Sequence, residues 1–93
     1  MTELPNEIKK YLNEEGESFE LILFNDDIHD FDFVIEKLKL HCGHTPEQAE
    51  QSALITHHKG ECSVLLGGED RIEKAKKKLA HEGLIVDSRK VTV

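Results

Sequence analysis

The sequence is short of aromatic residues and of cysteine, and both shortages limit what it can build. It has no tryptophan, one tyrosine and four phenylalanines among its 93 residues. We therefore expect the core to depend on leucine, isoleucine, valine and phenylalanine. The only cysteines are Cys42 and Cys62. In a chain without a secretion signal they are interpreted as free thiols rather than as a disulfide. A chain of this length forms one small domain with a single core.

Long apolar runs are also missing. No stretch approaches the roughly 20 residues needed to cross a bilayer, and residues 1–7 lack the basic and apolar blocks of a signal peptide. We expect a cytoplasmic, monomeric protein without a membrane partner.

Positive charge is the next shortage. There are 12 lysines and arginines against 19 acidic residues, a net charge of −7, which disfavours a protein that binds nucleic acid by neutralising phosphates. One basic run, residues 71–78, interleaves with Glu73 and Ala75 and is interpreted as a solvated helix face. The remaining composition, 38% hydrophobic and 33% charged, is typical of a globular chain.

The pattern of apolar residues and breakers predicts six elements. Asp30 and Gly43 are placed to cap one helix, and Thr45, Pro46 and Gln48 form a strong start signal for the next. The expected order is strand, helix, helix, strand, helix, strand, at residues 19–24, 31–42, 46–59, 62–66, around 72–79, and 84–86 with 91–93.

This order predicts an α+β fold. We expect a two-layer sandwich in which three helices cover one face of a three-stranded antiparallel sheet. Residues 1–17 are mostly polar and are expected to form a mobile N-terminal arm. Residues 18–93 are expected to form the folded domain.

Polar residues at two element ends suggest a site for an amine. Asn25 and Asp26 follow the first strand, and His57 lies near the end of the second helix. An amide oxygen, a carboxylate and a neutral imidazole could accept the three N–H bonds of an ammonium group. Apolar Ile28, Phe31 and Val34 lie between them in the sequence and could hold an attached side chain. The same residues also fit an ordinary turn and a helix end, so the pattern alone leaves both explanations open.

Catalytic and metal sites are less well supported. The segment His41-Cys42-Gly43-His44, with His57, His58 and Cys62 elsewhere, contains ligand types that zinc prefers. However, Cys42 matches the apolar helix face, and no paired Cys-x-x-Cys is present. We expect no metal, no cofactor and no enzymatic activity, because no nucleophile elbow or phosphate-binding loop appears either. A small thiol or metal protein remains one alternative.

The order of several motifs resembles the ClpS adaptor family. The matching elements, which span residues 19 to about 80, are Leu23-Phe24-Asn25-Asp26-Asp27, Phe33-Val34-Ile35, Ala49, His57 with Gly60, and Glu73 with Ala75. The resemblance implies a ClpS-like fold and an adaptor that binds the free N-terminal residue of N-degron substrates, namely Phe, Leu, Tyr or Trp. It also implies delivery of these substrates to a ClpA- or ClpC-type AAA+ unfoldase of the Clp protease.

The resemblance also implies roles for individual residues. Asn25, Asp26 and His57 would hold the α-amino group, and the start of the third helix, with Asp70 and Glu73, would meet the unfoldase. The first side chain of the substrate would be surrounded by Ile28, Phe31, Val34, Ala53 and Thr56.

This chain departs from the family pattern around the pocket. Phe31 stands where many relatives have methionine, Ala53 where a larger apolar residue is common, Thr56 where valine is usual, and His29 where threonine is frequent. These differences bear on the preferred first residue. An alternative is a non-adaptor interaction domain that resembles the C-terminal domain of the ribosomal stalk protein, a fold similar to that of the ClpS family.

Overall fold

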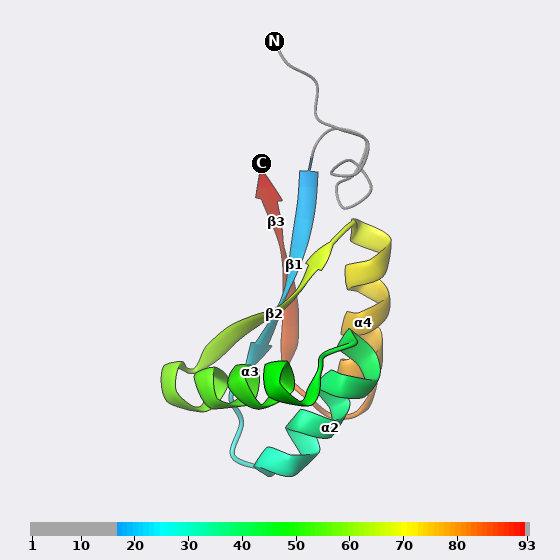
Figure 1. Cartoon of the computed structure of the whole chain (residues 1–93). Helices are drawn as coiled ribbons and strands as arrows, with labels where there is room; N and C mark the ends of the chain where they lie inside the picture. Colours follow the sequence, from blue (N-terminus) through cyan, green and yellow to red (C-terminus); the bar gives the residue numbers. More distant parts are fainter. Residues whose placement is uncertain (1–16, 93) are drawn as a thin grey trace.

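The computed structural model describes residues 17–92, which form two layers (Figure 1). The element order is β1 (Glu17–Phe24), α2 (Phe31–Cys42), α3 (Pro46–Lys59), β2 (Glu61–Gly67), α4 (Glu69–His81) and β3 (Val86–Thr92). Three helices and a three-stranded antiparallel sheet in this order confirm the predicted α+β sandwich. The predicted arm, residues 1–17, lies outside the described residues except for Glu17, which begins β1.

The middle strand of the sheet is the first one in the chain, since the strand order is β2-β1-β3. β1 pairs with both neighbours in antiparallel fashion, and the ladder to β2 shifts register between Leu21 and Ile22. As the central strand, β1 buries three successive residues, Leu21, Ile22 and Leu23. This burial explains the continuous apolar run seen in the sequence.

The helices begin and end at the residues expected from their capping signals. The Asp30 side chain accepts a hydrogen bond of 2.8 Å from the Phe33 N–H, and α2 ends at Gly43 with φ 67°. Thr45 and Gln48 form a reciprocal capping box at the start of α3, which ends at Gly60 with φ 91°. Only glycine adopts these positive φ values at little cost.

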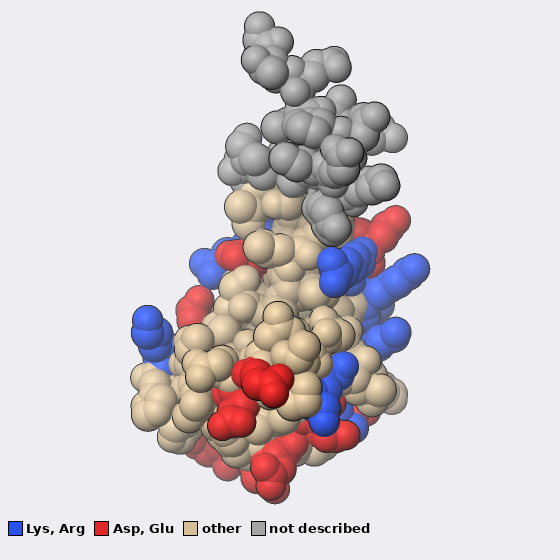
Figure 2. Space-filling model, in the orientation of Figure 1, with Lys and Arg blue, Asp and Glu red and all other residues tan. Residues whose placement is uncertain are grey.

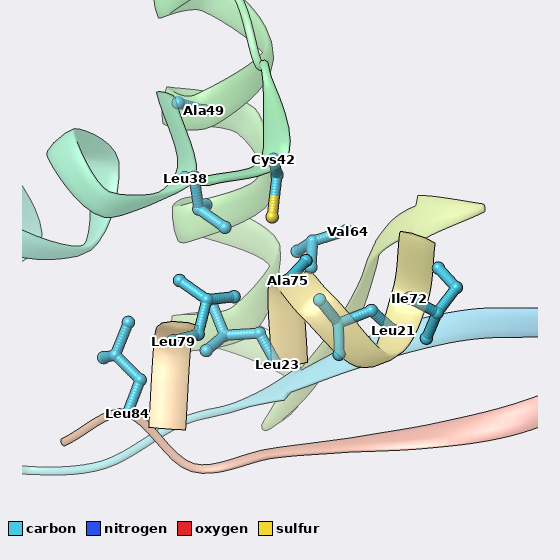
Figure 3. Packing of buried hydrophobic residues seen from close by; sticks show 10 residues of the cluster. All are labelled: Leu21, Leu23, Leu38, Cys42, Ala49, Val64, Ile72, Ala75, Leu79 and Leu84. Carbon is cyan, nitrogen blue, oxygen red and sulfur yellow. The ribbon is translucent and has the colours of Figure 1, made fainter. Parts of the chain in front are cut away.

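The core lies between the sheet and the helices (Figure 3). Leu21 and Leu23 of β1 face the apolar stripe of α4, formed by Ile72, Ala75 and Leu79. α2 adds Leu38 and Cys42, whose sulfur points toward this cluster (Figure 3). Burial raises the pKa of the Cys42 thiol to about 11, so Cys42 is a core residue that stays protonated at neutral pH. Cys42 and Cys62 are both free thiols.

The last strand differs most from its prediction. Leu84 and Ile85 were expected in the strand, but β3 begins at Val86 and runs through the polar residues 87–90. Leu84 is buried in the core just before the strand, whereas Ile85 is 53% exposed. β3 is an edge strand, and edge strands tolerate polar residues that hide the apolar signal.

Charge is unevenly distributed over the folded chain. Figure 2 shows acidic side chains gathered at the end of the molecule where the β1–α2 loop lies, and basic side chains along α4. Asp27, Asp30 and Asp32 are all exposed at the acidic end. Within residues 17–92, no helix has the length and apolar character required to cross a bilayer.

Candidate functional site

A cavity of about 320 Å³ lies where β1 ends, beside the first turn of α2 and the last turns of α3. Its position follows from two backbone hydrogen bonds. The Phe24 N–H donates to Ile85 O, and the Asn25 N–H donates to Gly60 O, each at 2.9 Å. The second bond ties the end of β1 to the end of α3, and it thereby brings residues 25–27 close to His57.

Seven of the eight residues predicted for the substrate site line this cavity. They are Asn25, Asp26, Phe31, Val34, Ala53, Thr56 and His57. They come from two helices, α2 and α3, and from the loop after β1. The fold thus brings together residues that the sequence separates by up to about thirty positions.

The Asp26 carboxylate is held by its own turn. Oδ1 accepts hydrogen bonds from the backbone N–H groups of Ile28 (2.9 Å) and His29 (2.8 Å). The His29 ring nitrogen Nδ1 lies 3.2 Å from Oδ1 and 3.1 Å from Oδ2. Oδ2 therefore keeps acceptor capacity that the turn does not use.

The charge state of Asp26 follows from these contacts. Burial raises the pKa of this carboxyl, but the hydrogen bonds from the backbone and ring of His29 and from the Ile28 N–H offset that effect and leave the pKa below its usual value. Asp26 is thus a fixed negative charge at neutral pH, with a side chain that is only 9% exposed.

Asn25 and His57 complete the polar side of the cavity. Neither side chain hydrogen-bonds to another residue in the part of the chain that the structure describes. His57 lies in the last turn of α3 and contacts the His58 ring edge-on, with 5.5 Å between ring centroids. Two acceptors without protein partners next to a carboxylate can receive the N–H donors of a cation.

The apolar side of the cavity has a small floor and an aromatic wall. Ala53 and Thr56 are buried, at 3% and 4% exposed, and Thr56 directs its hydroxyl to Ser52 O of its own helix at 2.7 Å. Its methyl group is therefore the part available to a ligand. Phe31 is 38% exposed and stands at the start of α2.

Ile28 is the one predicted pocket residue that the structure does not bring to the cavity. Its side chain is 87% exposed and is not part of the cavity lining. The reason is local, since the Ile28 N–H turns inward to the Asp26 carboxylate. The adjacent side chain therefore points toward solvent.

Five further residues line the cavity, and the sequence analysis assigned none of them a role in the site. They are Leu23, Phe24, Asp27, His29 and Leu84. Leu84 comes from the turn before β3, so only the tertiary fold brings it here. His29 had a signal in the sequence, because a histidine three residues after an aspartate in a turn can reach back to its carboxylate.

The segment His41-Cys42-Gly43-His44, considered as a source of metal ligands, does not line this cavity. His44 places Nε2 2.6 Å from Val64 O on β2, where the β1–β2 register shifts. Among residues 17–92, no group of three or more His, Cys, Asp or Glu side chains is arranged to hold a metal ion.

Asp70 and Glu73 lie in the first turns of α4. Asp70 is exposed, while Glu73 accepts a hydrogen bond from Ser88 Oγ at 3.3 Å. Gly67, just before α4, pairs with Phe19 near the start of β1, so α4 begins at the end of the sheet opposite the cavity (Figure 1).

Comparison with known proteins bears on the family and the fold of this chain. The family model described as ATP-dependent Clp protease adaptor protein ClpS matches residues 14–86. The chain belongs to the ClpS family. This is a family of adaptors rather than of proteases themselves. A search of curated proteins found no match.

A solved structure has the same fold as this ClpS-family chain. It is that of Agrobacterium tumefaciens ClpS2 bound to L-phenylalaninamide, with a TM-score of 0.73 and 21% sequence identity. The match covers 82% of this chain and 99% of the other.

Proposed function

We propose that this protein binds the free N-terminal residue of N-degron substrates, with Phe, Leu, Tyr or Trp as that residue, and delivers them to a Clp AAA+ unfoldase. The observation that carries the proposal is the cavity in which the Asp26 carboxylate, the Asn25 amide and the His57 ring adjoin an apolar hollow. A polypeptide N-terminus joins these two chemistries in one residue, because it has a cationic amine and a side chain on the same carbon.

The polar side would recognise the α-amino group. Asp26 Oδ2 would supply a charge-assisted acceptor, and Asn25 and His57 would accept the other two N–H bonds. The exposed acidic residues at this end of the molecule (Figure 2) would favour the approach of a cation over that of an anion.

The apolar side would recognise the first side chain. A volume of about 320 Å³ is near the lower limit for ligand pockets, about 300 Å³, which suits one residue rather than a longer segment. Burying a large aromatic side chain removes about 150–250 Å² from water, and the Phe31 ring can add a stacking contact. In the matched ClpS2 structure the bound molecule is L-phenylalaninamide, an aromatic residue with a free amino group, which supports the same ligand class here.

Delivery requires a second surface, and we assign it to the first turns of α4. Asp70 is exposed and Glu73 borders it, matching the face expected from the family pattern. A ClpA- or ClpC-type unfoldase is the proposed partner, because the family model is that of a Clp protease adaptor.

Two peptides that differ only at the amine test substrate binding. A fluorescent peptide beginning with Phe should bind, and its N-acetylated form should not, because the acetyl group removes the charge and two donors. Loss of a charged hydrogen-bonded contact costs about 2–5 kcal/mol, enough to abolish a micromolar affinity. Equal binding of both peptides would refute the proposal.

Partner choice is tested by a separate experiment. The parent protein and Asp70→Lys are used as bait for a purified ClpA- or ClpC-type unfoldase and for ribosomes. We expect capture of the unfoldase by the parent and loss in Asp70→Lys. Capture of ribosomes alone would favour the stalk-like interaction domain and would contradict the adaptor role.

A further inference from the structure

His29 is the residue whose contacts the proposed function leaves unused. Its side chain is 18% exposed and its Nδ1 lies 3.1 Å from Asp26 Oδ2, the carboxylate oxygen that the turn does not otherwise occupy. It lines the same cavity as His57.

Phe33 and Gly83 lie against the His29 ring. The ring stacks on Phe33 of α2, with centroids 4.7 Å apart and an angle of 19° between the planes. It also lies against Gly83, where an added Cβ would come within 3.2 Å of His29 Nε2. Gly83 has φ 91°, so this position favours glycine both for its backbone and for the room it leaves to the ring.

From this arrangement we infer that His29 is a positioning residue of the amine site, which orients Asp26 and competes with the ligand ammonium for Oδ2 when its ring is charged. The inference rests on the proposed function. In the neutral ring, Nδ1–H donates to the carboxylate and Nε2 carries no proton. In the charged ring, the imidazolium neutralises Asp26 from the side on which an ammonium would bind.

The competition follows from the charges around the ring. On its own turn the ring faces Asp26, and Asp27 lines the cavity beside it. On α2, Lys37 pairs with Glu82, and its Nζ lies 5.2 Å from the centre of the Phe33 ring. The hydrogen bond from Lys37 lowers the pKa of Glu82, so this acid stays ionised and paired instead of interacting with His29. His57 faces the cavity from α3.

One carboxylate thus faces two cations, the ligand amine and a protonated His29. Binding of the amine should expel a proton from His29, and by linkage affinity should fall as the ring becomes protonated. Histidine is the side chain that ordinarily changes charge between about pH 5 and 8. This is therefore the pH range in which the competition is tested.

Two substitutions separate positioning from competition. In His29→Asn the amide nitrogen takes the place of Nδ1, so the donor to Asp26 is kept but cannot titrate. In His29→Leu the donor is lost. At pH 7.5 we expect His29→Asn to bind a Phe-initiated peptide within about threefold of the parent and His29→Leu to bind about tenfold more weakly, as for loss of one hydrogen bond to a charged group.

The pH profile tests the competition itself. Between pH 7.5 and 5.5 the parent should lose more affinity than His29→Asn, by up to about tenfold per pH unit, the limit for one linked proton. Calorimetry at pH 6 in two buffers with different ionisation enthalpies should find more protons released by the parent than by His29→Asn. If His29 had only a structural role, the parent and His29→Asn would have the same pH profile and release the same number of protons.

The outcomes distinguish this inference from the proposed function. If the parent binds no peptide with a free N-terminus at pH 7.5, the proposed function is wrong. If it binds, and His29→Asn has the same pH profile and the same proton release as the parent, the His29 inference alone is overturned. Parental affinity in His29→Leu would overturn its positioning role.

Discussion

Replacing Asp26 by asparagine separates the two roles of this residue, which are to hold the turn and, on the proposed function, to bind the ligand amine. Oδ1 accepts the backbone N–H groups of Ile28 and His29, while within residues 17–92 the one hydrogen-bond partner of Oδ2 is the His29 ring. In Asp26→Asn the amide oxygen can keep both backbone bonds, which forces the NH₂ group into the place of Oδ2. The turn is then preserved, and the proposed ammonium site acquires a donor where it needs an acceptor.

The size of the effect follows from the lost charge. Two unit charges 4 Å apart interact by about 4 kcal/mol at an effective dielectric of about 20. Mutational losses for such charged contacts are about 2–5 kcal/mol. We therefore expect Asp26→Asn to weaken binding of a Phe-initiated peptide by about 30-fold to several thousandfold, since about 1.4 kcal/mol corresponds to a factor of ten.

Fluorescence anisotropy with a labelled peptide measures the affinity, and thermal unfolding followed by circular dichroism measures the fold. Asp30→Asn is the matched control, because it removes one negative charge from the same loop and asparagine caps helices as well as aspartate. We expect nearly parental affinity for Asp30→Asn. Parental affinity in Asp26→Asn would show that Asp26 serves only the turn, and equal losses in both variants would show that only the net charge of the loop matters.

The pH dependence of the free energy of unfolding tests the contribution of Asp26 to the turn. The pKa of Asp26 lies below its usual value in the folded state, so its carboxylate contributes stability above the unfolded-state pKa of about 3.9. That contribution is lost as the pH falls through the lower folded-state pKa. Any stability advantage of the parent over Asp26→Asn should therefore shrink below about pH 4.

Two further predictions concern the cavity floor and the thiols. Ala53→Leu places three more carbons at a site that is 3% exposed and lines the cavity; we expect Phe-initiated peptides to bind at least about fivefold more weakly, because overpacking costs about 1–3 kcal/mol, and an unchanged titration would contradict the assigned floor. Cys62 should react with a thiol reagent in the native protein, whereas Cys42, whose pKa burial raises to about 11, should react only on unfolding. Two equally fast thiols in the native parent, with one of them lost in Cys62→Ser, would contradict the placement of Cys42 in the core.

The sequence was sufficient for the parts of the fold that depend on local chemistry. Asp30, Thr45 and Gln48 make the capping bonds that their order predicted, because each bond joins groups only three residues apart. β3 was placed less well, since its polar residues reflect its position at the sheet edge, which only the tertiary fold determines.

The candidate site shows the same difference between features set by local chemistry and features set by the tertiary fold. Asn25, Asp26 and His57 could be proposed from the sequence because their donor and acceptor types are visible in it, and the structure brings all three to one cavity. Ile28 was misplaced because the direction of a side chain in a turn depends on where the backbone N–H points. Leu84 lies far along the chain, and nothing in its neighbourhood indicates a site.

The layout of the sheet sets a requirement for the substrate. The cavity lies at the end of β1, while the Asp70 face lies near its start, where Gly67 pairs with Phe19. From Phe19 to Phe24 the strand advances about 17 Å, at about 3.4 Å per residue. On the proposed function, a captured chain must cover at least that distance to reach the unfoldase, and an extended chain spans at most about 3.6 Å per residue. A substrate whose folded body begins directly after its first residue could therefore be bound yet not delivered, and an extended leader of about five residues would be the shortest that allows both.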